Sequence, residues 1–362
     1  MNAPLRTVMV ERLGCRYPII QTAMGWVAEP SLVIGSSNAG AFGFLGAAVM
    51  TPDEAREKIL AVRRGTDRPF GVNFHSFQPG AEQIVDLILA NSEQVRAVSF
   101  GRGPNAKMIA RFKDAGILCV PTVGAVKHAV KMAQLGVDMI TVQGGEGGGH
   151  TGSVPTTVLL PQVLDAVDVP VIAAGGFGDG RGLAAALAYG AVGIAMGTRF
   201  LLTRESPVPQ STKAGYLGAG TDDILVTTKL DGIPQRMVRT PMMDRIERSG
   251  PLGRWLRAYE AGMLMKRRTG ASWGDLLRSA REMTKDGGSL RQSLMAATMP
   301  MLIQRAVVDG DIENGVMATG VVGGRITEVP SCQELVDRIV AEARDRISAL
   351  TGPQALSTPH AA

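Results

Sequence analysis

A glycine-rich run that contains a histidine, residues 143–152, is the stretch of this chain best suited to chemistry. Six of its ten residues are glycine, and His150 supplies an imidazole. Because glycine has no Cβ, its backbone N–H groups can approach an anionic ligand closely. Histidine exchanges a proton near neutral pH. The combination predicts a cofactor-binding active site in which His150 transfers the proton.

Flexible linkers are the alternative explanation for a glycine run. Such linkers usually mix glycine with serine and have no strong strand in front of them. Here the apolar and β-branched residues 139–142 precede the glycines, and a second apolar stretch, 158–160, follows them. This context favours a ligand-binding loop at the end of a buried strand.

The first 205 residues predict the elements that position this loop. Helical patterns lie between short apolar runs, and Thr51 with Glu54 forms a capping box at the start of one of them. Strands that alternate with helices indicate parallel βαβ units, and eight units indicate a closed (β/α)8 TIM barrel of the α/β class. The expected strands are 17–21, 42–45, 70–73, 97–100, 118–121, 139–142, 169–173 and 193–196, and the expected helices include 51–64, 106–115, 126–135 and 180–189.

A doubly wound sheet is the competing architecture. Its dinucleotide-binding version should carry a GxGxxG pattern between a strand and a helix. Two glycine loops, 145–150 and 176–181, both lack glycine at the sixth position. The barrel is therefore the better prediction.

After residue 205 the composition changes, which predicts a mostly helical lid inserted after the eighth strand. Residues 206–300 hold 15 Lys/Arg and 9 Asp/Glu, a balance of +6, whereas the rest of the chain holds 23 and 24, a balance of −1. We expect the lid to cover the carboxyl-end mouth of the barrel. The expected parts are the barrel (1–205), the basic, Met-rich lid with helices at 252–265 and 271–286 (206–300), a return to the barrel with a last helix at 335–350 capped by Ser331 (301–352), and a flexible tail (353–362).

Composition also argues against several classes of protein. No stretch is long and apolar enough to predict a membrane span, and residues 1–14 lack the apolar core of a signal peptide. Cys15, Cys119 and Cys332 form no CxxC pair, which favours a reducing compartment, the cytoplasm, and argues against a metal site. The basic lid lacks interleaved stacking aromatics, so nucleic acid is not an expected partner. Its charge suits a ligand that carries phosphate, although a solvated helical face explains the charge equally well.

The loops after the last two strands predict a phosphate site. Barrel enzymes usually hold phosphate there, and both loops carry glycine, at 175–176 and at 197. The first loop also opens a helix, whose dipole favours an anion. Tight-turn geometry is the alternative reason for these glycines.

Other loops at the same end of the barrel carry polar groups suited to a planar ring. The loop 21–25, Asn73 and Gln143 follow three different strands, and side-chain amides can bond both edges of a flavin. Simple loop hydrogen bonding is the alternative for Asn73 and Gln143. His75 is a further candidate polar contact, whereas His128 is expected to face solvent from a helix.

Five of these segments together resemble the nitronate monooxygenase (2-nitropropane dioxygenase-like) family. They are residues 18–21, 70–73, 143–152, 173–176 and 196–200. The resemblance implies an FMN-binding barrel with a small lid after strand eight, and His150 matches the family's catalytic histidine. The cofactor contacts that it implies are Gly175, Gly176, Gly197 and Thr198 to the phosphate, Ala23, Met24, Gly25, Asn73 and Gln143 to the ring, with Gly148 and Gly149 beside them.

The family includes nitronate oxidation, an FMN enoyl-thioester reductase of bacterial fatty acid synthesis, and a branch in actinobacterial steroid catabolism. Lid segments 231–234, 293–297 and 308–311 are most similar to the steroid branch. That similarity implies an FMN-dependent oxidoreductase that desaturates, or reduces, the Cα–Cβ bond of a bicyclic acyl-CoA. Lys266, Arg267 and Arg268 would then bind the phosphates of CoA, and methionines would line the acyl pocket.

Two other functions remain open from the sequence. One is a nitronate monooxygenase that oxidises alkyl nitronates with O2, and the other is a phosphate-ligand-binding barrel without turnover. In the main hypothesis NAD(P) or another acceptor reoxidises the flavin. The acyl group, the direction of the reaction and the oligomeric state, with a homodimer as one option, are left open.

Overall fold

The computed structural model describes residues 5–100, 106–250 and 290–351, with the side chains of 290–298 and 351 excepted, and divides the chain into two compact units. The first unit comprises residues up to 147, 152–207 and those from 326 on, and the second comprises 148–151 and 208–325. The expected helices at 252–265 and 271–286 and the expected tail at 353–362 lie outside the described residues.

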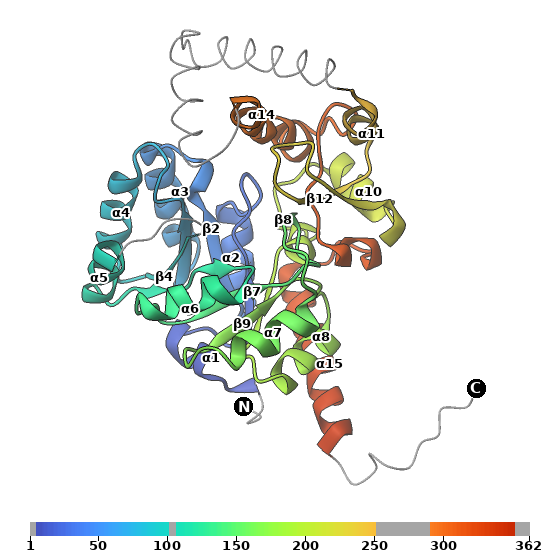
Figure 1. The fold of residues 1–362 in the computed structure, drawn as a ribbon. Helices are drawn as coiled ribbons and strands as arrows, with labels where there is room; N and C mark the ends of the chain where they lie inside the picture. Colours follow the sequence, from blue (N-terminus) through green and yellow to red (C-terminus); the bar gives the residue numbers. More distant parts are fainter. Residues whose placement is uncertain (1–4, 101–105, 251–289, 352–362) are drawn as a thin grey trace. The chain divides into compact units, whose positions relative to one another are not determined.

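Parallel strands form the framework of the first unit (Figure 1). They hydrogen bond in the order β5-β4-β3-β2-β1-β10-β9-β7-β6. The strands are β1 (Ile19–Gln21), β2 (Phe42–Gly46), β3 (Phe70–Phe74), β4 (Val95–Phe100), β5 (Leu118–Cys119), β6 (Thr122–Val123), β7 (Ile140–Gln143), β9 (Val171–Ala174) and β10 (Ile194–Met196).

This sheet closes on itself, because its two end strands are halves of one extended segment. β5 pairs with β4, β6 pairs with β7, and two residues separate β5 from β6. Main-chain bonds continue through the gap: Val120 N–H donates to Val98 O (2.8 Å), and Thr141 N–H donates to Pro121 O (2.9 Å). With β5 and β6 counted as one strand, the nine become eight. The predicted TIM barrel is confirmed.

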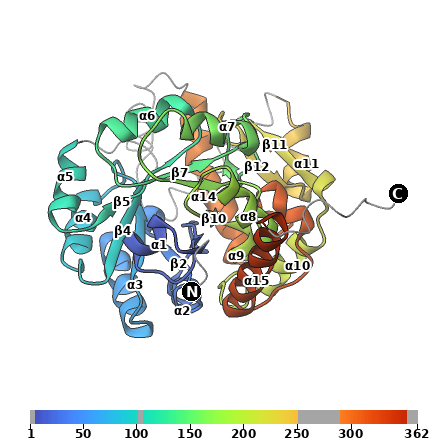
Figure 2. The same ribbon diagram turned by 90° about the horizontal axis from the view of Figure 1, so that it is seen from below.

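Helices surround these strands, as Figure 2 shows in the view from below. The last helix, α15, packs on α8. The helices of this unit are α1 (Val8–Leu13), α2 (Pro30–Asn38), α3 (Pro52–Gly65), α4 (Ala81–Leu89), α5 (Ala106–Asp114), α6 (Val126–Gln134), α7 (Thr156–Leu164), α8 (Gly180–Ala188), α9 (Thr198–Leu201) and α15 (Cys332–Thr351), with a 3-10 turn, η2 (Ala47–Val49).

Local signals fix where two of these helices begin. At α3, Thr51 Oγ1 accepts from Glu54 N–H (3.3 Å) and Glu54 Oε2 accepts from Thr51 N–H (2.7 Å), which is the predicted capping box. At α15, Ser331 Oγ accepts from Glu334 N–H (3.1 Å), and Glu334 Oε2 accepts from Ser331 N–H (2.9 Å). The predicted cap at Ser331 is confirmed, and each box satisfies backbone donors that the first turn cannot pair.

The second unit contains a three-stranded antiparallel sheet with the order β11-β12-β8. Its own core includes Met237 and Met243, with Met242 and Met299 packed against it. Met237 and Met243 therefore stabilise this core, and the expected role of methionines as walls of an acyl pocket stays a prediction. The elements are β8 (Gly149–His150), α10 (Gln210–Leu217), η3 (Thr221–Asp223), β11 (Ile224–Thr227), β12 (Gln235–Val238), α11 (Pro241–Arg248), α14 (Leu290–Val307) and η4 (Val321–Arg325).

Candidate active site

The glycine loops of the first unit come together at the carboxyl ends of adjacent strands. Ala174, the last residue of β9, pairs with Ala195 of β10 on one side and with Gln143 of β7 on the other. The loops that follow, at 175–176, 197–198 and 144–147, therefore start side by side. This is the end of a TIM barrel at which ligands bind.

Gly175 and Gly176 have backbone conformations that other residues rarely adopt. Their φ angles are +94° and +83°. A Cβ on Gly175 would lie 3.1 Å from Gly144 O and 3.2 Å from Thr156 Oγ1, and one on Gly176 would lie 3.3 Å from Glu146 Cβ. Glycine at both positions thus lets two neighbouring loops approach closely and leaves bare amides at the barrel's end, an arrangement that fits a phosphate.

The start of helix α8 does not offer the anion site that its dipole suggests. Gly180 N–H donates to Glu342 Oε2 (2.8 Å), and Gly182 N–H donates to Asp179 Oδ1 (3.2 Å). Protein carboxylates therefore already occupy these two amides. These contacts argue against the helix start as an anion site, and the phosphate contacts at Gly175 and Gly176 stay a prediction.

The loops after β1 and β10 also adjoin. A Cβ at Gly197 would lie 3.1 Å from Thr22 Oγ1 and 3.3 Å from Met24 Sδ. Thr22 N–H donates to Met196 O (3.1 Å), which continues the pairing of β1 with β10. The expected phosphate loop at 197–198 and the expected ring contacts at 23–25 are therefore neighbours in the fold.

The two amides expected at the ring are both oriented by the protein. Asn73 Nδ2 donates to Ser99 O (3.1 Å). This contact fixes the orientation of the Asn73 side-chain amide, whose oxygen can accept a further hydrogen bond. Gln143 lies against Gly147, where a Cβ would come within 2.5 Å of the Gln143 side chain. Glu146 holds the same loop to α7, since its carboxylate accepts from Thr156 N–H (2.8 Å) and Thr156 Oγ1 (2.6 Å).

Gln21, the last residue of β1, and Trp26, in the loop that follows, differ from what the sequence suggested. Gln21 is fully buried and bonds Thr22 O, Phe44 O and Ser36 Oγ, so it supports the barrel rather than a ligand. In the part of the chain that the structure describes, Trp26 is the single non-glycine residue with a positive φ, +60°. Such strain gathers at functional sites. No sequence pattern marks a tryptophan for it, so sequence reasoning missed this residue.

His150 belongs to the second unit, although the chain on both sides of residues 148–151 belongs to the first. It lies on β8, paired with Gln235 of β12. Its Nε2 lies 2.7 Å from Oδ2 of Asp231, which is 8% exposed. A Cβ on Gly148 would come within 2.6 Å of Gly320 N, and Gly149 has a φ of +65°, so the backbone conformation requires glycine at both positions.

The structure also places the other two histidines that the sequence analysis assigned. His75 stacks on Phe77, and His128 is exposed on α6.

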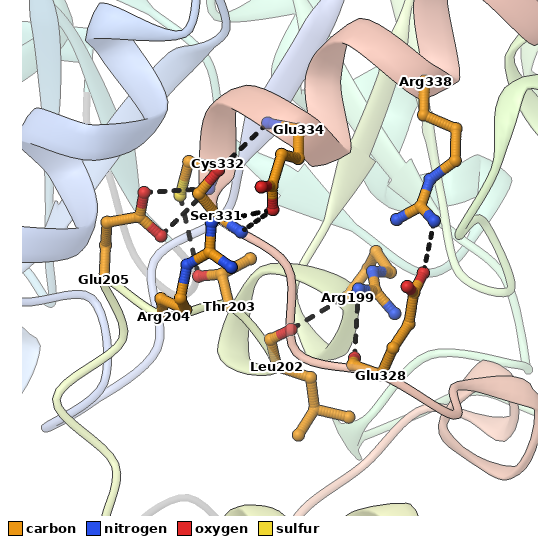
Figure 3. A network of polar contacts seen from close by, with 10 residues as sticks. All are labelled: Arg199, Leu202, Thr203, Arg204, Glu205, Glu328, Ser331, Cys332, Glu334 and Arg338. Carbon is orange, nitrogen blue, oxygen red and sulfur yellow. Dashed lines mark hydrogen bonds and ion pairs between the residues drawn. The ribbon is translucent and has the colours of Figure 1, made fainter.

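A network of polar contacts follows the loop at 197–198 (Figure 3). Arg199 is 4% exposed, and its Nη2 donates to Leu202 O (3.5 Å) and Glu328 O (3.3 Å). Burial lowers the pKa of Arg199 to about 10, which leaves the guanidinium charged at neutral pH. Its partner residue Glu328 also forms an ion pair with Arg338 of α15 (2.5 Å).

The same network joins the segment that leaves the barrel to the segment that returns. Glu205 accepts from Cys332 N–H (2.9 Å), and Arg204 pairs with Glu334 (2.8 Å), as Figure 3 shows. The first unit ends its second segment at Pro207 and resumes at Ile326. These contacts therefore hold together the two segments of the first unit, before Pro207 and after Ile326, between which the chain of the second unit is inserted.

Some expected features cannot be placed. Lys266, Arg267 and Arg268 lie outside the described residues. Within residues that the structure does describe, no helix is both long and apolar enough to span a bilayer, and no group of three His, Cys, Asp or Glu side chains is arranged to hold a metal ion.

A closed parallel barrel with glycine loops gathered at the carboxyl ends of its strands defines a ligand-binding TIM-barrel protein, the class in which phosphate-bearing cofactors are held. The sequence profile of the nitronate monooxygenase family matches residues 6–86 and 77–342. The chain belongs to this family. It is an oxidoreductase, and the cofactor that the family implies is a flavin.

Three comparisons define the place of the chain within that family. It is 48% identical to the (3aS,4S,5R,7aS)-5-hydroxy-7a-methyl-1-oxo-octahydro-1H-indene-4-carboxyl-CoA dehydrogenase of Rhodococcus jostii (strain RHA1), over 96% of this chain and 98% of that protein. It is 31% identical to a probable nitronate monooxygenase of Staphylococcus saprophyticus, over 67% of this chain and 81% of that one. The structure of FabK from Thermotoga maritima has a TM-score of 0.77 at 33% identity, and covers 95% of this chain and 98% of that one.

Proposed function

We propose that this protein is an FMN-dependent dehydrogenase that desaturates the Cα–Cβ bond of a bicyclic acyl-CoA. One observation carries the proposal: the similarity to an indene-carboxyl-CoA dehydrogenase extends over 96% of the chain, whereas that to a probable nitronate monooxygenase extends over 67%. A shared substrate requires similarity in the segments that recognise it as well as in those that bind the cofactor. A bicyclic acyl-CoA therefore accounts for the pattern better than an alkyl nitronate does.

FMN suits the loops of the barrel unit. Gly175, Gly176, Gly197 and Thr198 would hold the phosphate through backbone amides, and bare amides on glycine loops are a common anion cradle. Ala23, Met24, Gly25, Asn73 and Gln143 would contact the ring, and Gly148 and Gly149 would lie beside it. When bound, the flavin accepts the hydride that leaves Cβ.

His150 would act as the general base at the thioester. It takes the α-proton, so that the Cα–H bond breaks, an N–H bond forms, and the electron pair left on carbon becomes the second bond of the Cα=Cβ product. The imidazole follows Gly147 by three residues, and three residues span at most roughly 10 Å. His150 therefore follows directly on the glycine loop to which the resemblance assigns the cofactor contacts.

Anaerobic reduction tests the substrate assignment. The yellow holoprotein is mixed without oxygen with bicyclic acyl-CoA esters, with straight-chain acyl-CoA esters or with propionate-3-nitronate, and loss of the flavin absorbance is followed. We expect rapid bleaching by a bicyclic acyl-CoA and recovery of the colour with an acceptor, for which NAD(P)+ and an artificial dye are compared. Bleaching by the nitronate alone would overturn the proposal.

His150→Ala tests the assignment of the base. Since a positioned general base contributes about 100-fold or more to the rate, we expect turnover to fall by at least that factor while FMN stays bound. His128→Ala is the matched control, because His128 is exposed on α6. Full activity of the His150 variant would remove that residue from the mechanism.

A further inference from the structure

The short distance between His150 and Asp231 joins two parts of the chain that the sequence keeps 81 residues apart. The Asp231 side chain is almost completely buried, whereas about half of the His150 side chain is exposed. The Nε2 edge of the imidazole is therefore held by the protein, while about half of the side chain stays exposed to solvent. A base that acts on a substrate needs this arrangement.

Main-chain contacts set the position of both partners. β12 pairs with β8 so that Gln235 lies opposite His150, and Thr151 N–H donates to Pro234 O (3.0 Å). Asp231 is fixed in turn, because its Oδ1 accepts from Ile233 N–H (3.0 Å). The pair is thus a property of the folded backbone of the second unit and not of two long, mobile side chains.

The charge of Asp231 suits the role of an acceptor. Burial by itself raises the pKa of its carboxyl, but hydrogen bonds from His150, from Gln235 and from Ile233 N–H outweigh burial and lower the pKa below its usual value. Asp231 is therefore a carboxylate at neutral pH. A carboxylate accepts hydrogen bonds and does not donate them, so it selects the imidazole form that carries hydrogen on Nε2.

We propose that Asp231 is the positioning residue of the catalytic base: it accepts the Nε2–H of His150, directs the basic lone pair to Nδ1, and stabilises the imidazolium that forms when Nδ1 takes the α-proton. This inference rests on the proposed role of His150 as the base. Carboxylates orient catalytic histidines in this way in unrelated enzymes. The segment inserted after the eighth strand of the barrel thus contributes one defined residue to the chemistry.

Spectra of the wild-type holoprotein supply the first test, and they require no variant. Protein labelled with 15N-histidine is studied by NMR at neutral pH, and the His150 signal is identified by its loss in His150→Ala. We expect the neutral ring to carry its hydrogen on Nε2. A ring that carries its hydrogen on Nδ1 would overturn the proposal.

Kinetics of Asp231→Asn supply the second test. An amide keeps the shape but can present N–H to Nε2, so we expect the Nε2–H form to be lost and kcat to fall about 10- to 100-fold, with KM changed less than about 3-fold. Asp311→Asn is the matched control: it removes the same charge from the same unit, where Asp311 bonds Asn314. We expect that variant to keep both kcat and the His150 signal.

The double variant separates a role through His150 from a general structural role. If Asp231 acts through the imidazole, Asp231→Asn costs nothing further when His150 is already alanine, and a further loss of more than about 3-fold would contradict the proposal. Flavin content and the melting temperature verify that each variant is folded. Should His150→Ala retain full activity, the proposed function itself fails. Should it lose activity while Asp231→Asn keeps the wild-type kcat and spectrum, the role of Asp231 alone fails.

Discussion

Substitution of Gly175 by alanine tests whether the loop after β9 holds the cofactor. An L-residue at its φ of +94° is strained by about 1–2 kcal/mol. The new Cβ would also lie 3.1–3.2 Å from Gly144 O, Gly144 N and Thr156 Oγ1, contacts that force the neighbouring loop outward. Overpacking of this kind costs about 1–3 kcal/mol, so unfolding should become easier by about 2–5 kcal/mol in total.

Gly190→Ala separates strain from damage to the site. Gly190 has a φ of +99° and follows α8, but a Cβ there would meet nothing nearer than Leu164 Cδ1 at 3.9 Å. This control carries the same backbone strain in the same unit without crowding, so it should lose about 1–2 kcal/mol of stability and no cofactor affinity.

The assay is reconstitution of the apoprotein with FMN, followed by the quenching of flavin fluorescence, together with urea unfolding. For Gly175→Ala we expect the Kd for FMN to rise about 10- to 100-fold, because the amides at 175–176 move with the displaced loop. The Kd of Gly190→Ala should equal that of the wild type. If both variants bind FMN equally well, the phosphate does not lie on this loop and the reasoning is refuted.

Three further predictions concern backbone strain and the chemistry of two thiols. Trp26→Gly should be more stable than Trp26→Ala by about 1 kcal/mol in urea unfolding, because glycine relieves the positive φ; the opposite order would show that residue 26 is unstrained. Burial raises the pKa of the half-buried Cys15 and of the buried Cys119 to about 12, so iodoacetamide should label neither thiol rapidly in the folded protein at pH 8, and rapid labelling would contradict the raised pKa values. Since both pKa values lie above the ordinary 9.0, the thiols favour the folded state below pH 9, and this stabilisation should be lost as the pH rises towards 12.

Several features of the fold could be predicted because their signals are local. Runs of four or five mostly apolar residues marked every strand of the barrel, since a parallel strand is buried on both faces. The capping boxes at Thr51 and Ser331 involve residues three apart. The glycines at 175 and 176 follow their strand directly and adopt the positive φ that glycine permits.

Other features depend on contacts that no local pattern contains. The start of α8 is a plausible anion site in the sequence, and Glu342, 162 residues later, occupies its first amide. Gln21 has the chemistry of a ring contact, but the packing of β1 against β2 buries it.

The sequence by itself determined the barrel, because periodicity, caps and glycine spacing act within a few residues, and it indicated the family through five similar segments. Only the tertiary structure decided that His150 leaves the barrel unit to pair with β12, and that Asp231 is the carboxylate beside it. The physical reason is register. Which residue lies opposite His150 depends on how two distant strands align, and that alignment is settled by the packing of the whole second unit.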